Sequence, residues 1–300
     1  MFDNLALLVQ APLLNVQLLL DGLLIGAIFA LAAYGLALVW GVMNVKNLAQ
    51  GDFVIMGGYI AFALQKLGLH PVISLPIAAA AMFGFGWLVY VFIIRHVITK
   101  DLFTSLLATF GLAILLQQAL NLIFGPEVQT ADSGFQTLLL FDGFVTVAVI
   151  KLIALALAGA LALAVVLFMK RSRMGQAIRA TAQDARAARV LGVNTDRVYA
   201  FTFALNSAIC GAAGVLIVMI WVIQPFYGIT YSIRSFVIVV FAGLGNLPAV
   251  IFSALGLGAA EQFSAFVLGA EFQVAAVVCF LLAVLVWRQI QQARLRQVVE

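Results

Sequence analysis

Long apolar runs separated by short polar connections follow one another along the whole chain of 300 residues. Several runs are close to the roughly 20 residues that a helix needs to cross the hydrocarbon core of a membrane, and they lack the two-residue alternation of membrane β-barrel strands. The pattern predicts an all-α fold, a polytopic transmembrane helical bundle of eight or nine membrane segments. We place these segments at about 17–40, 52–69, 71–94, 101–124, 143–169, 198–223, 232–250, 250–268 and 272–288.

Two of these segments are irregular. The segment 52–69 is short, and 232–250 contains the sequence GLGNLP, whose glycines and proline interrupt a helix. We expect one or both to be broken or re-entrant, because unwound backbone at membrane depth persists only where it is buried in protein or lines a water-filled path. No linker or soluble domain is evident, so residues 1–300 are predicted to form a single transmembrane domain.

The composition agrees with a membrane protein and excludes an ordinary soluble one. Hydrophobic residues make up 65% of the chain and charged residues 9%, whereas about a quarter of the residues of soluble domains are charged. The two cysteines, Cys210 and Cys279, lie inside apolar runs. We interpret both as buried thiols, with no disulfide framework.

The charges between the segments predict the orientation of the chain. Basic residues occur at 95–100, at 170–197 and after the last segment, whereas the connection 125–142 holds three acids and neither Lys nor Arg. By the positive-inside rule, the three basic places face the cytoplasm and the acidic connection faces outward. The first 45 residues carry two acids and no basic residue. We therefore expect an N-out, C-in topology.

The stretch 170–197 holds seven basic and two acidic residues, in a chain whose net charge is +4. At 100° per residue it predicts a short helix with a polar face and an opposite face of small or apolar residues, namely Arg179, Gln183, Arg186 and Arg189 against Ala177, Thr181, Ala188 and Leu191. Gly192 suits the position after a helix C-cap, and Asn194 or Thr195 suits the N-cap of the next helix.

Two interpretations of this cytoplasmic helix stand side by side. One is ordinary positive-inside charge lying on anionic lipid. The other is a docking helix for a cytoplasmic partner, because a topology signal needs only two or three basic residues and no ordered small-residue face.

Three stretches of the chain carry a resemblance to a known family. These are GLALVWGVMNVKNLAQGDFVIMGGYIAF at 35–62, SRMGQAIRATAQDARAARVLGVNTDRVYAFTFALNSAICGAAGVL at 172–216 and PFYGITYSIRSFVIVVFAGLGNLPAVIFSALGLGAAEQF at 225–263. They resemble the LivH-type permease subunits of branched-chain amino acid ABC importers. The second contains the A-A-x-x-x-G core of the loop by which such permeases engage their ATPase, with Arg186 where a Glu is usual. The chain departs from the family at 50–52, which reads QGD in place of an H-G-E-like triplet. It departs again at its basic C-terminus.

The resemblance implies a permease of the bacterial inner membrane that works with other chains. The expected partners are a homologous, LivM-like second permease, two ABC ATPases, a periplasmic substrate-binding protein and the lipid bilayer, but no nucleic acid. This chain would bind no cofactor, and its partner subunits would use ATP. The expected ATPase-coupling residues, within the coupling loop 170–197, are Arg179, Gln183, Arg186, Ala187, Ala188, Arg189 and Gly192.

Polar and helix-breaking residues inside the apolar segments are candidates for a transport pathway or gate, because such residues usually face a cavity or a partner in the membrane. They are Asn44, Asn47, Gln50, Asp52, Gly243, Gly245, Asn246, Pro248 and Glu261. For Asp52 the alternative is a simple acid near a helix N-terminus, and for Glu261 it is a structural pairing. We interpret Arg234 as a snorkelling or interface anchor, and most glycine clusters as helix packing contacts.

Other functions fit the sequence less well. A stand-alone secondary transporter would carry several acids in mid-span, and these are nearly lacking. The sequence contains neither H-E-x-x-H nor G-x-S-x-G, so we expect no enzyme, and it contains no P-loop motif for ATP. The predicted function is import of branched-chain or other small apolar amino acids. The alternative is a urea, short-amide or aromatic-acid importer of the same type.

Overall fold

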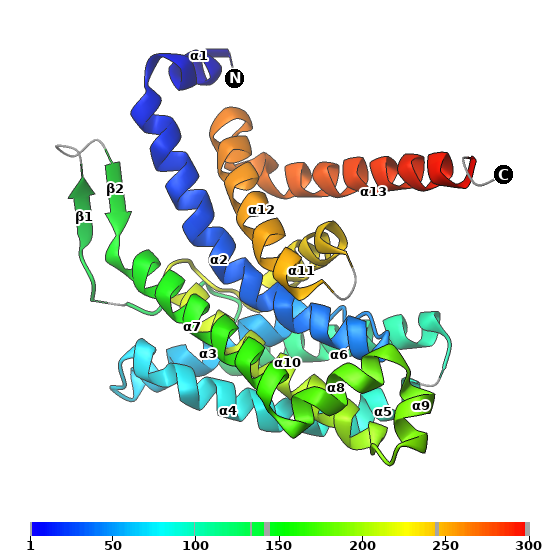
Figure 1. Ribbon diagram of the computed structural model, residues 1–300. Helices are drawn as coiled ribbons and strands as arrows, with labels where there is room; N and C mark the ends of the chain where they lie inside the picture. The colour runs from blue at the N-terminus through cyan, green and yellow to red at the C-terminus, as the bar shows by residue number, and fades with distance from the viewer. Residues whose placement is uncertain (1, 99, 133, 141–144, 244–245, 298–300) are drawn as a thin grey trace.

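The computed structural model describes residues 2–98, 100–132, 134–140, 145–243 and 246–297, which form a bundle of helices with one small hairpin (Figure 1). The first half contains α1 Phe2–Gln10, α2 Pro12–Met43, α3 Gln50–Lys66, α4 Pro71–Val89, η1 Tyr90–Ile94, α5 Arg95–Val97 and α6 Leu102–Phe124. The hairpin pairs β1 Thr137–Leu140 antiparallel to β2 Val145–Ala148. The rest contains α7 Val149–Arg171, α8 Arg173–Gln183, α9 Ala185–Val190, α10 Thr195–Val218, η2 Pro225–Tyr227, α11 Gly228–Ala242, α12 Leu247–Leu268, η3 Ala270–Phe272 and α13 Gln273–Gln297.

The predicted helical membrane bundle is confirmed. Within the described residues, eight helical segments are long and apolar enough to cross a membrane, and α3, with 17 residues, falls just short. Two predicted boundaries are wrong. The segment 143–169 begins as strand β2 and becomes helical only at Val149. The segment 232–250 is divided between α11 and α12, because Gly243 takes a positive φ of 81° that ends α11.

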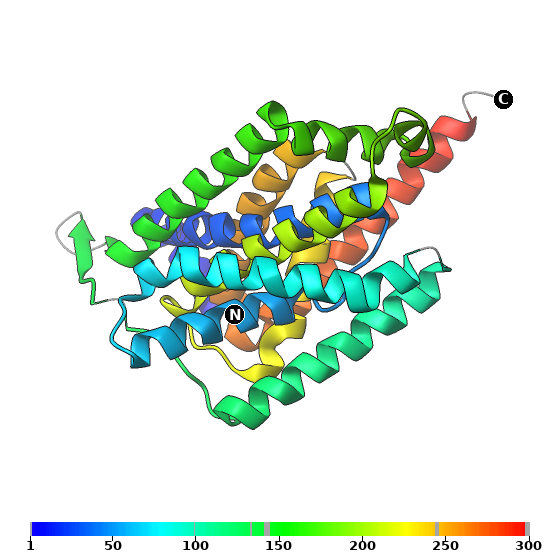
Figure 2. The same ribbon diagram turned by 90° about the horizontal axis from the view of Figure 1, so that it is seen from below.

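Helices α2 and α10 form the centre of the bundle. Nearly every residue of α2 from Leu24 to Val39 is buried, and so is most of α10. Helices α3, α4, α11 and α12 pack around this pair. In contrast, α13 is peripheral, and both views show its C-terminal part extending beyond the other helices (Figures 1 and 2). Cys210 is fully buried as predicted, but Cys279 is exposed because α13 has few neighbours, so its predicted burial is wrong.

The three basic places lie together at one end of the bundle. Figure 2 shows α9, the start of α6 and the C-terminus at one end, with the β-hairpin at the other. At the first end, Arg95 forms an ion pair with Asp196 at 3.3 Å. At the second, Gln129 in the acidic connection pairs its backbone with Ile223. The predicted basic stretches and the acidic connection therefore lie at opposite ends of the bundle, and the N-out, C-in orientation stays a prediction.

Several helices begin at a side chain that accepts a backbone N–H, as helix N-termini require. His70 caps α4, Asp101 caps α6, Asn194 caps α10 and Asn246 caps α12. At Asp101 the hydroxyl and amide of Thr104 both donate to the carboxylate, and these bonds hold the pKa of Asp101 below its ordinary value.

The predicted short segment is a helix that begins inside the bundle. The chain 44–49 leaves the end of α2 without regular secondary structure, and α3 then starts at Gln50, which is fully buried. Gln50 lies against Asn206, at the midpoint of α10. At its other end, Gln65 of α3 donates to the Asp132 carbonyl in the acidic connection. Together the non-helical chain 44–49 and α3 lead from the end of α2 to the acidic connection.

Glycines allow the tightest helix contacts. A Cβ on Gly258 of α12 would lie 2.7 Å from the Cα of Gly26 and even closer to the carbonyl oxygen of Gly22, both on α2. A Cβ on Gly57 of α3 would lie 2.5 Å from the Cα of Gly211 on α10. The interpretation of these glycines as packing contacts is confirmed, since only a residue without a side chain permits this approach.

We predict that Gly258→Ala destabilises the protein, because the added methyl group meets backbone atoms that cannot rotate away. The expected loss is about 1–3 kcal/mol, typical of overpacking. Gly256→Ala is the matched control, since no atom lies within 4 Å of a Cβ at that position on the same helix. Thermal unfolding of both variants in detergent micelles measures the difference, and equal stability would contradict the packing role of Gly258.

Candidate functional site

The basic stretch after α7 folds as two helices, so the predicted single helix is wrong. Helix α8 ends at Gln183 and α9 begins at Ala185. Asp184 between them has extended backbone, with φ −154° and ψ 105°, and its Oδ1 accepts the amides of Arg186 and Ala187 at 2.8 and 3.0 Å. The carboxylate thus acts as an N-cap and restarts the helix, a competition with helix continuation that is typical of Asp. Gly192, with a φ of 86°, and the Asn194 cap occur as predicted.

Only part of the predicted small-residue face packs against the bundle. Thr181 and Ala188 are buried as expected, together with Gly175 and Ile178. Leu191, which the prediction placed on that face, is 83% exposed, as is Val190 beside it. The prediction for Leu191 is wrong because the turn at 191–192 carries its side chain past the end of α9.

The tip of α9 therefore presents apolar and basic side chains together. Val190 and Leu191 are flanked by the exposed Arg186 and Arg189. Gln183, Ala187 and Gly192 are also exposed, whereas Ala188 faces inward. Arg179 takes a different direction, because its Nη1 donates to the Met169 carbonyl at the end of α7. An exposed apolar tip is unusual on a surface that meets water, and it is typical of a contact with another protein.

A second group of predicted residues meets at the start of α3. The Gln50 amide nitrogen donates to the Ala32 carbonyl at 2.8 Å and to Asn206 Oδ1 at 2.9 Å, and it lies 3.0 Å from Cys210 Sγ. Asn206 Nδ2 donates back to Gln50 Oε1 at 3.1 Å, and Asn47 Nδ2 reaches the same oxygen at 3.4 Å. This closed network joins α3 to both central helices.

The first turn of α3 obtains further partners from two other helices. Ser232 of α11 accepts the Gly51 amide at 2.8 Å and donates to the Leu48 carbonyl at 2.8 Å. Gln117 of α6 donates to Asp52 Oδ1 at 2.9 Å. Asp52 Oδ2 is buried without a hydrogen-bond partner among the described residues. Asp52 lies in the first turn, as an acid near a helix N-terminus would, although the N-cap position belongs to Ala49.

The sequence did not single out Asn206, Ser232 or Gln117. Each is an isolated polar residue inside an apolar segment, and that is the signal by which they are recognised. Asn44, another predicted pathway residue, does not join this network. It is exposed at the end of α2, where it takes a left-handed φ of 53°.

The structure pairs Glu261 with Arg234, so the interpretation of Arg234 as an interface anchor is wrong. Arg234 Nε donates to the two Glu261 oxygens at 2.8 and 3.1 Å, and Gln273 donates to Oε2 at 3.1 Å. Arg234 is 8% exposed and Glu261 fully buried. Such a pair connects α11, α12 and α13, and removing one member of a buried pair typically costs about 3–5 kcal/mol.

Arg234 also faces a cavity of about 530 Å³ at the hairpin end of the bundle. Its guanidinium carbon lies 5.0 Å from the ring centroid of Phe29, which stacks on Trp221 at 6.0 Å. Tyr231 and Lys151 line the same cavity. Each of these two cations is paired with a carboxylate, so the cavity offers aromatic walls and guanidinium N–H donors without net charge. Such walls suit a small ligand that has both an apolar part and a hydrogen-bond acceptor.

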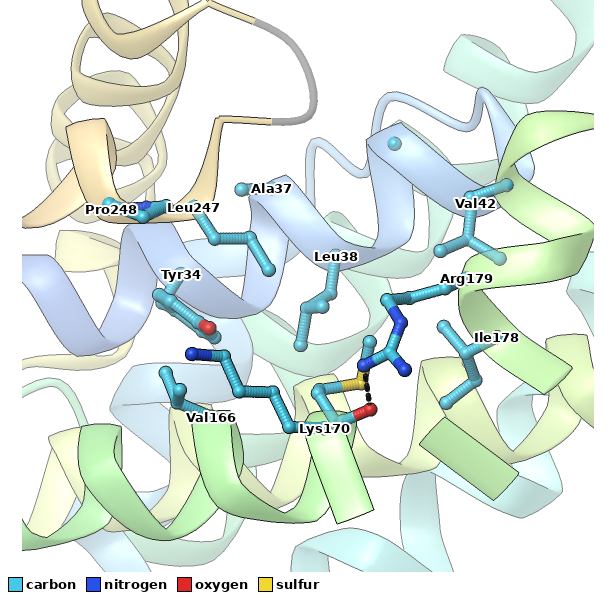
Figure 3. A pocket seen from close by; sticks show the side chains of 13 residues that line it. Tyr34, Ala37, Leu38, Val42, Val166, Lys170, Ile178, Arg179, Leu247 and Pro248 are labelled. Carbon is cyan, nitrogen blue, oxygen red and sulfur yellow. Dashed lines mark hydrogen bonds between the residues drawn. The ribbon is translucent and has the colours of Figure 1, made fainter. Parts of the chain in front are cut away.

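The remaining gate candidates lie at the opposite end, far from Asn206 along the helices. Asn246 caps α12, and Pro248 is exposed on its first turn. Leu247 and Pro248 line a pocket together with Arg179 of α8 and Lys170 of α7 (Figure 3). Gly243 ends α11, and Gly245 lies outside the described residues. The predicted pathway residues thus fall into three separate places, and Gly243, Asn246 and Pro248 lie at the end that carries α8.

Comparison with known proteins decides the family. Residues 18–287 match the family described as branched-chain amino acid transport system / permease component. The chain belongs to this family. It is a permease component that spans a membrane several times, and no solved structure gives a significant match to it.

Three relatives show how far the similarity of this permease extends. The high-affinity branched-chain amino acid transport system permease protein LivH of Salmonella typhimurium is 31% identical over 253 residues, covering 77% of this chain and 80% of that protein. The BraD permease protein of Pseudomonas aeruginosa is 29% identical over 246 residues, with the same coverage. A probable LivH permease protein of Methanocaldococcus jannaschii is 25% identical over 253 residues, covering 78% and 76%.

We predict that Gln50→Ala destabilises this permease, because it removes the acceptor of the buried Asn206 Nδ2 and the donor that joins α3 to the Ala32 carbonyl. An unsatisfied buried polar group typically costs about 1–3 kcal/mol. Gln65→Ala, the same change in the same helix, removes only a half-exposed hydrogen bond and should cost much less. Chemical unfolding in detergent tests both variants. A Gln50→Ala protein as stable as Gln65→Ala would contradict the role of the network.

Proposed function

We propose that this permease is the LivH-like membrane subunit of an ATP-binding-cassette importer for branched-chain or other small apolar amino acids, in the inner membrane of a bacterium. Its partners would be a LivM-like second permease, two ABC ATPases and a periplasmic substrate-binding protein. The chain itself would hold no ATPase site, and ATP would be used by the partner subunits. The family match over residues 18–287 is the observation that carries this proposal.

The cavity beside Arg234 supports the substrate class. In the predicted orientation it opens at the outward end, where a binding protein would deliver its ligand. The Arg234 Nε is occupied by Glu261, and the rest of its guanidinium lies against the aromatic wall. A guanidinium suits a carboxylate, and aromatic rings suit an apolar side chain. An amino acid with an apolar side chain offers both, whereas urea offers neither.

The α9 tip supports docking to an ATPase. Its exposed Val190 and Leu191 follow the exposed Arg186 and Arg189 in the chain, and apolar side chains beside arginines are common in protein contacts. Lipid contact alone would require no apolar tip beyond the end of the bundle. Nucleotide-driven closure of the ATPases would move α9 and α8, and rigid-body movement of the spans would then alternate access. Asn47, Gln50 and Asp52 would act as pathway or gate elements in that movement, and so would the helix ends at Gly243 and Asn246.

The transport proposal is tested with the permease and its proposed partners reconstituted in proteoliposomes. We expect uptake of leucine, isoleucine and valine that requires the binding protein and ATP, and that stops when the ATPase active site is inactivated. Urea, a short amide and an aromatic carboxylate serve as competing substrates. Uptake by the permease alone would identify a secondary transporter, and preference for urea or an aromatic acid would contradict the substrate class.

We predict that the pair Arg186→Glu and Arg189→Glu, and separately Leu191→Asp, reduce the amount of ATPase that co-purifies with the permease at least tenfold. The first change reverses the charge beside the tip, and the second places a charge among its apolar side chains. Lys100→Glu is the matched control, because it reverses an exposed charge at the same end of the bundle. Co-purification equal to that of the control would exclude docking through α9.

A further inference from the structure

The pocket beneath α8 adjoins an apolar groove on the membrane-spanning surface. The pocket, of about 300 Å³, lies between α2, α7, α8 and the start of α12. The groove, of about 340 Å³, lies between α2, α7 and α12. Tyr34 and Val166 line both, so the two spaces adjoin each other at these side chains. Among the described residues that line the groove, none is charged, and Tyr34 is the one with a polar side chain.

The mouth of this space is basic and has no acidic partner. Lys170 and Arg179 are exposed and line the pocket, and both extend into it in Figure 3. Arg179 donates to the Met169 carbonyl, so its position is fixed beside the end of α7. In the described part of the chain, no carboxylate lies within ion-pair distance of Lys170 or Arg179. Two cations held together without a counter-charge attract an anion.

Tyr34 adds a hydrogen-bonding group at the junction. Tyr34 is only 2% exposed, and its hydroxyl has no hydrogen-bond partner within the described residues. Figure 3 shows this hydroxyl directed into the pocket, on the side from which Lys170 approaches. A buried hydroxyl without a partner costs free energy, and a ligand oxygen at this point would relieve that cost.

The combined length of the pocket and the groove matches the thickness of one leaflet of a membrane. Along α7, the groove and pocket extend from Leu155 to Lys170, which at 1.5 Å per residue is about 22 Å. Half of a bilayer with its headgroup layer is about 20–22 Å thick. The groove is open at its side, where Leu155 and Leu163 are exposed and no atom lies within 4 Å of a Cβ placed on Gly159.

We propose that this space binds one acidic phospholipid, with its phosphate at Lys170, Arg179 and the Tyr34 hydroxyl and an acyl chain in the groove between α2, α7 and α12. A free phosphate would use the mouth but leave the groove empty, and a zwitterionic lipid would fill the groove but lack the net charge that matches two cations. The lipid would join α8 to three membrane helices. The binding itself does not depend on which substrate the permease carries.

The test is native mass spectrometry of the purified full chain with phosphatidylglycerol and with phosphatidylcholine of the same acyl chains. We expect phosphatidylglycerol to bind the wild-type protein at least tenfold more tightly. Lys170→Gln combined with Arg179→Gln should lower its affinity roughly thirtyfold, from two surface charges. Gly159→Leu, which fills the groove and leaves both cations in place, should lower it at least tenfold. Arg186→Gln combined with Arg189→Gln is the control and should keep wild-type affinity.

Four results would overturn the proposal. One is equal binding of the two lipids to the wild-type protein, a measurement that needs no variant to fold. The second is unchanged phosphatidylglycerol binding in the Lys170→Gln and Arg179→Gln protein. The third is full competition by inorganic phosphate with no effect of Gly159→Leu, which would indicate an anion site. The fourth is loss of the lipid when the permease assembles with its partners, which would show that another subunit covers the groove.

Discussion

The start of a helix in the interior of the bundle is the constraint on which the rest of the structure depends. A helix N-terminus leaves backbone N–H groups without intrahelical partners, and in a membrane no water is present to satisfy them. Helix α3 begins at this depth, so its neighbours must supply the partners. Ser232 of α11 accepts the Gly51 amide, and the Gln50 side chain ties the same turn to Ala32 and Asn206. Five helices are thereby fixed to one point, since Gln117 adds α6.

Close backbone approach makes this arrangement sterically feasible. Gly51 touches the backbone of Gly228 on α11, and the Cα of Gly57 faces that of Gly211 on α10. Lipid tails provide no hydrophobic force between helices, so close packing must hold the helices together. The glycines at these points permit that packing, whereas in a water-soluble protein the burial of large apolar side chains stabilises the core. The polar network and the glycine contacts therefore support each other. The network needs short distances between the helices, and the glycines provide them.

The class of fold and many helix caps and turns could be predicted from the sequence. Contacts between residues that are distant in the chain could not. Apolar periodicity locates most helices, and glycine and proline locate the break at 243–248. The Asn194 cap and the Gly192 turn depend on nearby residues only, and both were predictable. The division at Asp184 was missed because an Asp cap and helix continuation compete locally, and packing decides between them. The partner of Arg234 is 27 residues away on another helix, and its burial follows from packing that no local pattern contains.

The interruption at Asp184 has a mechanical consequence. Helix α8 is anchored, since Ile178 is fully buried and Gly175 packs closely on the backbone of Met169. In helix α9 only Ala188 is buried against the bundle, and the side chains at its end are exposed. The single extended residue Asp184 therefore separates α8, which packs on the membrane helices, from α9, which projects away from them. A force on α9 therefore reaches the membrane helices by two routes. One is α8, which packs on α2, α7 and α10, and the other is the short connection 191–194 by which α9 joins and contacts α10.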